Sequence, residues 1–382
     1  MSGRTAIIAG ATGLPYRRRA EGVSTHDLLR DAFLALLAQT GLERDRIDGL
    51  AVASFTLRPD TTIDLAWRLG LRPSWIMSDS HGGASGLNML QHAVRAVEAG
   101  DAEAIAILAA DRFSAEDMAA LNDNYNVNTR DNLAPLEFGG PNSLFAMLTS
   151  RMMQQDGLVR EDFGRLCIAQ REWAAGNPRA AYRDALTMQD YLEARPVADP
   201  LCVFDCVPVV AGAEAVLVAR EGMVKGAPNI RLRAFRARHN FDRHEGDGLR
   251  TGLSEVAADL WQAAGLAPGD VDLVQCYDDY PVMVLVQLRD LGLVGDMALR
   301  DFIARRIATR ELPVNTSGGQ LSAGQPGAAG GLHGLVEAVC QLRHDAGARQ
   351  VTDARRALVS GYGMMEYRYC LCANAAVLER VA

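Results

Sequence analysis

Residues 315–330 read Asn315-Thr316-Ser317-Gly318-Gly319-Gln320-Leu321-Ser322-Ala323-Gly324-Gln325-Pro326-Gly327-Ala328-Ala329-Gly330. This glycine-rich loop leads into a predicted helix after Gly327 and then into an apolar strand at residues 357–360. The same order of turn, helix and buried strand occurs earlier in the chain, after Gly83 and at residues 104–109. Short apolar strands that alternate with amphipathic helices predict an α/β fold.

A second pair of segments repeats as well. Residues 41–50 and 265–274 both begin with Gly-Leu, carry an Asp seven residues later, and lie between a predicted helix and a predicted strand. Two common helix–strand patterns could coincide, but the shared register favours an internal duplication. We therefore predict a duplicated α/β/α/β/α five-layer sandwich. Its N-terminal half covers residues 1–225, with a loop insertion at about 113–200, and its C-terminal half covers residues 226–382.

The composition excludes several classes of protein. The chain has 382 residues, of which 49% are hydrophobic and 23% charged, and its net charge is −8. These values argue against disorder and coiled coil, and the acidic balance disfavours binding to nucleic acid or to a membrane surface. The N-terminus lacks the pattern of a signal peptide, and no apolar run is long enough to span a membrane. Seven scattered cysteines indicate a reducing, cytoplasmic location and give no metal-binding pattern.

The motifs together resemble the thiolase superfamily, in particular its sterol-carrier-protein-type and lipid-transfer-type members, over nearly the whole chain. Residues 315–330 resemble the family's Asn-x-x-Gly-Gly…Gly-His-Pro-x-Gly-Ala-x-Gly loop, and residues 83–86 resemble its Cys-x-x-Gly nucleophile turn. Residues 204–213 are similar to the stretch before the family's mid-chain strand. Residues 277–280 take the place of its His-Asp-x-Phe or Asn-Glu-x-Phe box, and residues 361–364 take the place of its last Cys-x-Gly-Gly loop.

The resemblance implies that this chain has lost the groups of thiolase chemistry. The nucleophilic cysteine is replaced by Gly83, the histidine of Gly-His-Pro by Gln325, and the polar residue of the box by Tyr277. The second cysteine corresponds to Val359 or Ser360. Because glycine has no side chain, no acyl-enzyme can form at position 83, and cysteine-dependent thiolysis or Claisen condensation is disfavoured. Alkylation of the cysteines is therefore expected to leave activity intact.

The replacements still carry chemistry. Residues 277–280, Tyr-Asp-Asp-Tyr, put two phenols and two carboxylates at the carboxyl end of a strand, where ligands of open α/β sheets lie. Gln325 keeps an amide where the family's histidine polarises the thioester, and the resemblance places Tyr362 at the same pocket. His81 could reach in from the helix-opening turn. The catalytic candidates are Tyr277, Asp279, Gln325, Tyr362 and His81.

The substrate-binding candidates are Gly83, Asp278, Tyr280, Gly324 and Gly363. Structural roles stay open for some residues of both sets. The tyrosines could only fill the pocket, one of the two aspartates could cap the helix that begins at Pro281, and His81 and Gln325 could serve their turns.

A set of enolate donors with phenol or carboxylate bases and no nucleophile favours aldol or retro-aldol cleavage of a β-hydroxyacyl-CoA. This pattern resembles the cysteine-less thiolase-like aldolases of steroid side-chain degradation. The resemblance implies coenzyme A as part of the substrate, no covalent cofactor, and a small zinc-ribbon/OB-fold acyl-CoA-binding partner. It also implies a homodimer in which residues 104–109 pair across the two-fold axis. The alternatives are an acyltransferase or condensing enzyme of lipid metabolism, and a non-catalytic acyl-CoA-binding scaffold.

Overall fold

Two β-sheets form the frame of the protein in this computed structural model, which describes residues 4–57, 61–112, 116–117, 119–120, 131, 140–241, 246–364 and 369–381. The first sheet has the strand order β1 (Ala6–Gly13), β7 (Gly212–Arg220), β4 (Ala104–Asp111), β2 (Gly49–Ala53) and β3 (Trp75–Asp79). The second sheet has the order β8 (Asn229–His239), β11 (Cys372–Val381), β10 (Arg356–Gly363) and β9 (Leu273–Cys276).

The two sheets share one topology. In the first, β7 pairs antiparallel with both β1 and β4, and β2 lies parallel to β4. In the second, β11 pairs antiparallel with both β8 and β10, and β9 lies parallel to β10. A parallel bridge between Val274 and Val314 stands where β3 stands in the first sheet. The repeat seen in the sequence is thus a repeat of strand pairing.

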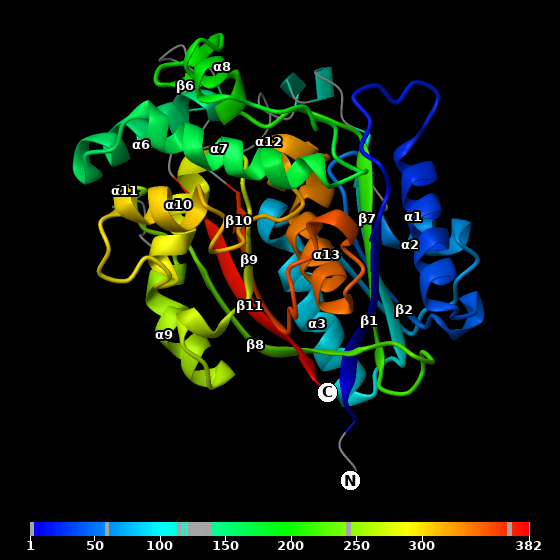
Figure 1. Ribbon diagram of the computed structural model, residues 1–382. Helices are drawn as coiled ribbons and strands as arrows, with labels where there is room; N and C mark the ends of the chain where they lie inside the picture. The colour runs from blue at the N-terminus through cyan, green and yellow to red at the C-terminus, as the bar shows by residue number, and fades with distance from the viewer. Residues whose placement is uncertain are drawn as a thin grey trace.

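Helices separate and cover the sheets (Figure 1). The helices α3 (Ser85–Ala99) and α13 (Gly330–Arg343) lie between the sheets and share one apolar core with strands of both. The outer face of the first sheet is covered by α1 (Thr25–Thr40) and α2 (Thr62–Arg68). On the far side, α9 (Leu253–Ala264) and α10 (Pro281–Asp290) pack on the second sheet. The predicted α/β/α/β/α layering is confirmed.

The repeated aspartates have the same structural role in both halves. Asp48 accepts hydrogen bonds from the backbone N–H groups of Glu103 and Ala104, at 2.9 and 2.8 Å. Asp272 accepts hydrogen bonds from the corresponding N–H groups of Arg355 and Arg356, both at 2.8 Å. Each carboxylate thus ties the loop before one parallel strand to the first residues of its neighbour.

The predicted insertion at about 113–200 is largely helical where it is described. It contains α6 (Pro141–Asp156), α7 (Arg160–Ala175) and α8 (Met188–Leu192), which lie over one end of the sheets (Figure 1). Most of its first part, residues 113–139, lies outside the described residues. The division of the chain at residue 225 stays a prediction.

One expectation about the sheet is wrong. The strand at residues 104–109, expected to pair across a two-fold axis, belongs to β4, and β4 is hydrogen-bonded to β7 on one side and β2 on the other. It has no free edge for a second chain. The edge strands of this sheet are β1 and β3. None of the helices in the described part of the chain is long and apolar enough to cross a membrane.

Candidate active site

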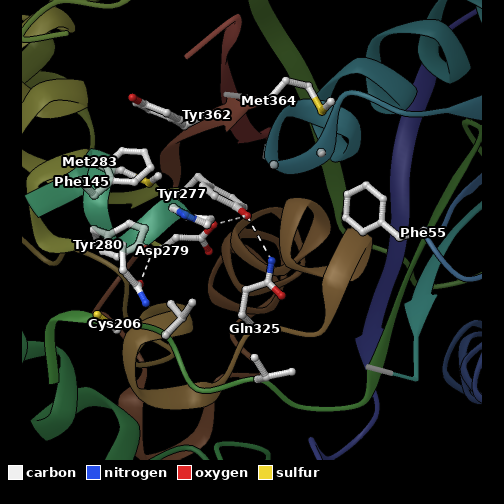
Figure 2. A pocket seen from close by; sticks show the side chains of 16 residues that line it. Phe55, Phe145, Cys206, Tyr277, Asp279, Tyr280, Met283, Gln325, Tyr362 and Met364 are labelled. Atoms are coloured by element: carbon white, nitrogen blue, oxygen red, sulfur yellow. Dashed lines mark hydrogen bonds between the residues drawn. The ribbon is translucent and has the colours of Figure 1, made fainter. Parts of the chain in front are cut away.

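A cavity of about 220 Å³ lies at the carboxyl ends of β2, β9 and β10, beneath α6 (Figure 2). Six of the ten residues predicted from the sequence line it: Gly83, Tyr277, Asp279, Tyr280, Gln325 and Tyr362. They come from separate parts of the chain: Gly83 follows β3 of the first sheet, whereas Tyr277 and Tyr362 lie at the carboxyl ends of β9 and β10 of the second sheet. The fold thus brings residues of several motif matches to one cavity.

Tyr277 and Asp279 form a hydrogen-bonded pair at the end of β9. The Tyr277 hydroxyl donates to Oδ2 of Asp279 at 3.0 Å, and the Gln325 amide donates to the same hydroxyl at 3.4 Å (Figure 2). Both side chains face the cavity. A phenol between a carboxylate and an amide donor is placed to pass a proton from a bound substrate to the carboxylate.

Asp279 has the properties of a general base. Burial raises its pKa to about 7, although the hydrogen bond from Tyr277 acts in the opposite direction. Its second oxygen, Oδ1, is enclosed and has no hydrogen-bond partner among the described residues. A carboxyl group whose pKa lies near neutral pH exchanges protons readily, which is what acid–base catalysis requires.

Gly83 is covered by the ring of Tyr277. Gly83 belongs to the short helical turn η2 (Gly82–Ala84), which leads directly into α3. A Cβ atom on Gly83 would lie 2.4 Å from Cε2 of Tyr277 and 2.4 Å from the carbonyl oxygen of Tyr362. Both distances are far below van der Waals contact, so this packing leaves no room for a nucleophilic side chain at position 83.

Aromatic side chains form one wall of the cavity. The ring of Tyr280 stacks on Phe145 at 4.4 Å, and the Tyr280 hydroxyl donates to Oδ1 of Asn142 at 2.7 Å. Tyr362 meets Phe145 edge-on at 6.1 Å. Phe145 and Asn142 lie on α6, so this helix closes the cavity over the two tyrosines.

Gln325 serves its own loop as well as the cavity. Its Oε1 accepts a hydrogen bond from the N–H of Gly327 at 2.7 Å, while its Nε2 faces Tyr277. Asp111, at the end of β4, then links this loop to the first sheet. It accepts from the N–H of Ala328 at 2.7 Å and from the N–H of Phe55 at 3.0 Å. These bonds hold Gln325 and the Phe55 ring on the same side of the cavity.

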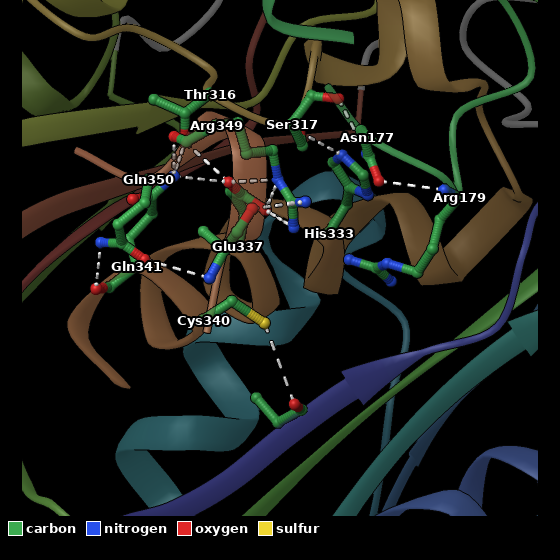
Figure 3. Close-up of polar contacts among 12 residues, drawn as sticks. Asn177, Arg179, Thr316, Ser317, His333, Glu337, Cys340, Gln341, Arg349 and Gln350 are labelled. Atoms are coloured by element: carbon green, nitrogen blue, oxygen red, sulfur yellow. Dashed lines mark hydrogen bonds and ion pairs between the residues drawn. The ribbon is translucent and has the colours of Figure 1, made fainter. Parts of the chain in front are cut away.

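Buried polar contacts anchor the glycine-rich loop at residues 315–330 (Figure 3). Ser317 Oγ lies 2.7 Å from Nε2 of His333, and the Ser317 carbonyl accepts from Asn177 at 2.9 Å. Thr316 donates to Glu337 at 2.8 Å. Because His333 and Glu337 both lie on α13, the loop is held by the helix that follows it.

Asp278 does not line the cavity. It is buried and accepts hydrogen bonds from the N–H groups of Gln320 and Leu321, at 2.9 and 3.3 Å, and from Gln170 at 3.0 Å. It therefore holds the first turn of α12 (Gly319–Ala323), and burial raises its pKa to about 8. The expectation that Asp278 or Asp279 caps the helix at Pro281 is wrong, because the N-cap of α10 is Tyr280 and no side chain caps it.

Three other predicted residues lie outside the cavity lining. His81 is paired with Asp79, with Nδ1 at 3.0 Å from Oδ2, and this hydrogen bond raises the pKa of His81. A Cβ on Gly363 would lie 1.9 Å from the His81 carbonyl oxygen, so Gly363 permits close packing of the last loop on the helix-opening turn. Gly324 has a φ of +116° and lies against Val210. The two glycines shape the walls without facing the cavity.

Sequence reasoning missed much of the apolar lining. The missed residues include Phe55, Asn142, Phe145, Cys206, Met283 and Met364. Cys206 lies in the stretch 204–213 that already matched a family motif, so that match could have identified it. No sequence signal pointed to the α6 residues, because α6 lies in the predicted insertion and outside every segment that matched a family motif. In the described part of the chain, no three His, Cys, Asp or Glu side chains are grouped so as to hold a metal ion.

The repeated sheets, the paired central helices and the turn at Gly83 define a thiolase-type fold. A family model described as "Thiolase C-terminal domain-like" matches residues 236–372. A 17-hydroxy-3-oxo-4-pregnene-20-carboxyl-CoA lyase from Mycobacterium tuberculosis is 33% identical, over 90% of this chain and 92% of its own length. The chain belongs to the thiolase superfamily of enzymes, as an aldolase-like member without the nucleophilic cysteine.

Two further similarities agree with this assignment. A steroid side-chain-cleaving aldolase from Thermomonospora curvata is 29% identical, over 88% of this chain and 90% of its own length. A solved structure described as "Ltp2-ChsH2(DUF35) aldolase" superimposes with a TM-score of 0.84 at 26% identity, and the match covers 98% of each chain. The similarity therefore extends over both sheets.

Proposed function

We propose that this protein cleaves a carbon–carbon bond of a β-hydroxyacyl-CoA thioester by a retro-aldol reaction. The observation that carries the proposal is the Tyr277–Asp279 pair, which faces the cavity directly over Gly83. This arrangement provides a base for a hydroxyl proton and leaves no room for an enzyme nucleophile. Acyl transfer through a covalent intermediate at position 83 is accordingly disfavoured.

The proposed step begins at the β-hydroxyl group of the substrate. The Tyr277 oxygen takes the hydroxyl proton while the Tyr277 proton passes to Oδ2 of Asp279, so no free phenolate builds up beside a carboxylate. The bond between the α and β carbons breaks as the carbonyl group of the ketone or aldehyde product forms. Its electron pair becomes the enolate of the shorter thioester. The proton received by Asp279 then returns through Tyr277 to the α carbon, which completes that ester and restores the carboxylate.

The enolate needs hydrogen-bond donors at the thioester oxygen. Gln325 presents its Nε2 amide to the cavity, and Gly82 and Gly83 line it at the start of a helical segment. Backbone N–H groups at the start of a helix lack intrahelical acceptors and carry the positive end of its dipole. These donors would stabilise the developing charge, and removal of one such donor typically costs about 10²- to 10³-fold in kcat.

The cavity walls suit a large apolar acyl group. Phe55, Phe145, Val207, Val209 and Met283 line it together with the site residues. The relatives named above include a pregnene-carboxyl-CoA lyase and a steroid side-chain-cleaving aldolase. We therefore propose a CoA thioester with a steroid-like acyl group as the substrate class. Retro-aldol cleavage by these steps requires no cofactor besides the coenzyme A of the substrate.

Two partners belong to the proposal. The first is a small acyl-CoA-binding protein of the zinc-ribbon and OB-fold type, and the description of the similar structure, which names ChsH2(DUF35) beside Ltp2, supports it. The second is another copy of this chain, docked at the edge strand β3. Ile76 on β3 and Ile63 and Trp67 on α2 are exposed there, and the Trp67 side chain is 77% exposed. Such apolar side chains beside an open sheet edge favour association.

The deciding experiment follows turnover of a β-hydroxyacyl-CoA. The purified protein, alone and with its co-encoded partner, is incubated with the thioester, and products are separated by chromatography. We expect a ketone or aldehyde and the shorter CoA ester in equal amounts. Tight binding of the thioester without cleavage, in the presence of the partner, would instead identify the protein as a scaffold.

A further inference from the structure

Several exposed arginines, without an ion pair among the described residues, lie on segments that adjoin the cavity wall. We infer that Arg17, Arg18 and Arg183, on the two segments that meet where Arg18 lies over Tyr182, bind the phosphate groups of the CoA thioester. This inference rests on the proposed function, because it assigns a place to the nucleotide end of the same substrate.

The arginine-rich loop at residues 17–19 is tied to the cavity wall. Arg17 and Ala211 exchange two backbone hydrogen bonds, at 2.9 and 2.8 Å. Two residues before Ala211, Val209 pairs with Gln325 and lines the cavity. Since a strand advances about 3.3 Å per residue, Arg17 starts within about 10 Å of Val209. The arginine-rich loop thus begins next to the wall that carries Val209 and Gln325.

Tyr182 is held beside the same loop from the other direction. Its N–H donates to the carbonyl of Ser322 at 3.1 Å, three residues before Gln325. The guanidinium of Arg18 lies over the Tyr182 ring at 5.1 Å, and that of Arg171 lies over it at 5.7 Å. Arg171 also donates to Ser322 Oγ at 3.0 Å. The Tyr182 ring is thus in contact with the guanidinium groups of both Arg18 and Arg171.

Among the described residues, the exposed charges of this cluster have no acidic partner within ion-pair distance. Arg17, Arg18, Arg19 and Arg183 are exposed, and none of them makes an ion pair in the described ranges. By contrast, the nearby Arg179 is partly buried and paired with Glu214 at 3.1 Å.

Two acids lie close to the cluster in sequence. Asp184 follows Arg183 and acts on Arg171, and Glu21 lies two residues after Arg19. On a chain of net charge −8, a local excess of positive charge at a cavity rim indicates an anionic ligand.

The chemistry of coenzyme A fits this cluster. A CoA thioester carries a diphosphate and a 3′-phosphate at the end remote from the thioester, and a phosphate monoester holds about −2 charge at neutral pH. Guanidinium groups bind phosphate oxygens through paired, charge-assisted hydrogen bonds. The thioester would lie at Gln325 and Tyr277 while the phosphates lie at Arg17, Arg18 and Arg183.

The test compares ligands with and without the phosphates. Calorimetry gives the dissociation constants of CoA, 3′-dephospho-CoA and S-acetyl-pantetheine for the wild type and for Arg17→Ala/Arg18→Ala. We expect CoA binding to weaken on the order of tenfold or more for each arginine removed. S-acetyl-pantetheine binding should not change, and the salt dependence of CoA binding should decrease. The matched control is Arg44→Ala/Arg46→Ala, in η1 (Arg44–Arg46) before β2, at the opposite end of the sheet.

Two results would overturn the inference. One is a wild-type affinity for CoA in the double variant. The other is an unchanged affinity for CoA together with lost binding of the partner protein, which would make the cluster a docking site for an acidic protein surface. The test needs no turnover, so it is separate from the aldolase assay. A variant that loses CoA affinity supports the phosphate site even if the retro-aldol proposal fails.

Discussion

The ring of Tyr277 occupies the space into which any side chain on Gly83 would project. The glycine at position 83 and the phenol at position 277 are therefore sterically coupled, since no side chain can be added at position 83 while the ring is in place. A cysteine at position 83 would need a smaller neighbour at position 277, and the present phenol needs a glycine beneath it. This coupling gives the first prediction.

Gly83→Cys should destabilise the protein and should not restore acyl transfer. The new side chain would overlap the Tyr277 ring and the Tyr362 carbonyl, and overpacking of this kind costs about 1–3 kcal/mol. Urea denaturation measures the change in the free energy of unfolding. Gly83→Cys/Tyr277→Ala should recover only part of the loss, because the backbone carbonyl stays in place. Wild-type stability of the single variant would contradict the packing described.

Tyr277→Phe and Asp279→Asn should each lower kcat on the order of 10²- to 10⁴-fold and leave substrate binding nearly unchanged. The reason is that each removes one member of the proton path and little volume. Asp278→Asn is the matched comparison, since Asp278 is adjacent but holds the first turn of α12. It should lower the melting temperature more than it lowers kcat. If Tyr277→Phe and Asp279→Asn both turn over like the wild type, the catalytic role of this pair is refuted.

The rate should depend on pH through Asp279. A base with a pKa of about 7 makes kcat/KM rise up to about pH 7 and then level off, and Asp279→Asn should remove this rise.

Stability should change in the opposite direction. The folded carboxyl group holds its proton to higher pH than the unfolded one, whose pKa is about 4. The free energy of unfolding should therefore fall between about pH 4 and pH 7. Denaturation of wild type and Asp279→Asn at pH 5 and pH 8 checks the sign, because the variant should show the smaller decrease.

Iodoacetamide at neutral pH should leave most of the activity intact. Burial raises the pKa of both Cys206 and Cys276 to about 12, so few thiolates are present. Prolonged treatment at higher pH should label Cys206, which lines the cavity, before the fully buried Cys276. Peptide mass spectrometry identifies the labelled residue, and Cys206→Ala should keep kcat while resisting inactivation. Rapid, substrate-protected labelling of Cys276 would contradict this.

Light scattering should give twice the chain mass of 41.2 kDa at micromolar concentration. Trp67→Glu or Ile76→Glu should shift the protein to the monomer, because each places a charge in the apolar surface beside β3. Leu34→Glu on α1, another exposed apolar position, is the control and should leave the mass unchanged. A wild-type monomer would rule out the dimer and leave the exposed surface to another partner.

The layered fold could be predicted because its signals are local and repeated. The pattern of strand, turn and helix occurs twice, and Asp48 and Asp272 mark the same position in both copies. The absence of a side chain at Gly83 is likewise a property of the residue itself. No folding of the chain could supply a nucleophile there, so the sequence alone excluded cysteine chemistry at that turn.

The tertiary structure decided which polar groups face the cavity. Asp278 and Asp279 are adjacent and chemically identical, yet only Asp279 reaches the cavity, because the N–H groups of α12 bind Asp278. His81 likewise does not line the cavity, because its imidazole is hydrogen-bonded to Asp79. The aromatic wall at Phe145 also depends on contacts between distant segments. The sequence by itself determined the layered fold and the absence of a nucleophile at position 83. Long-range packing determined the Tyr277–Asp279 pair, because the direction of a side chain depends on partners far away in sequence.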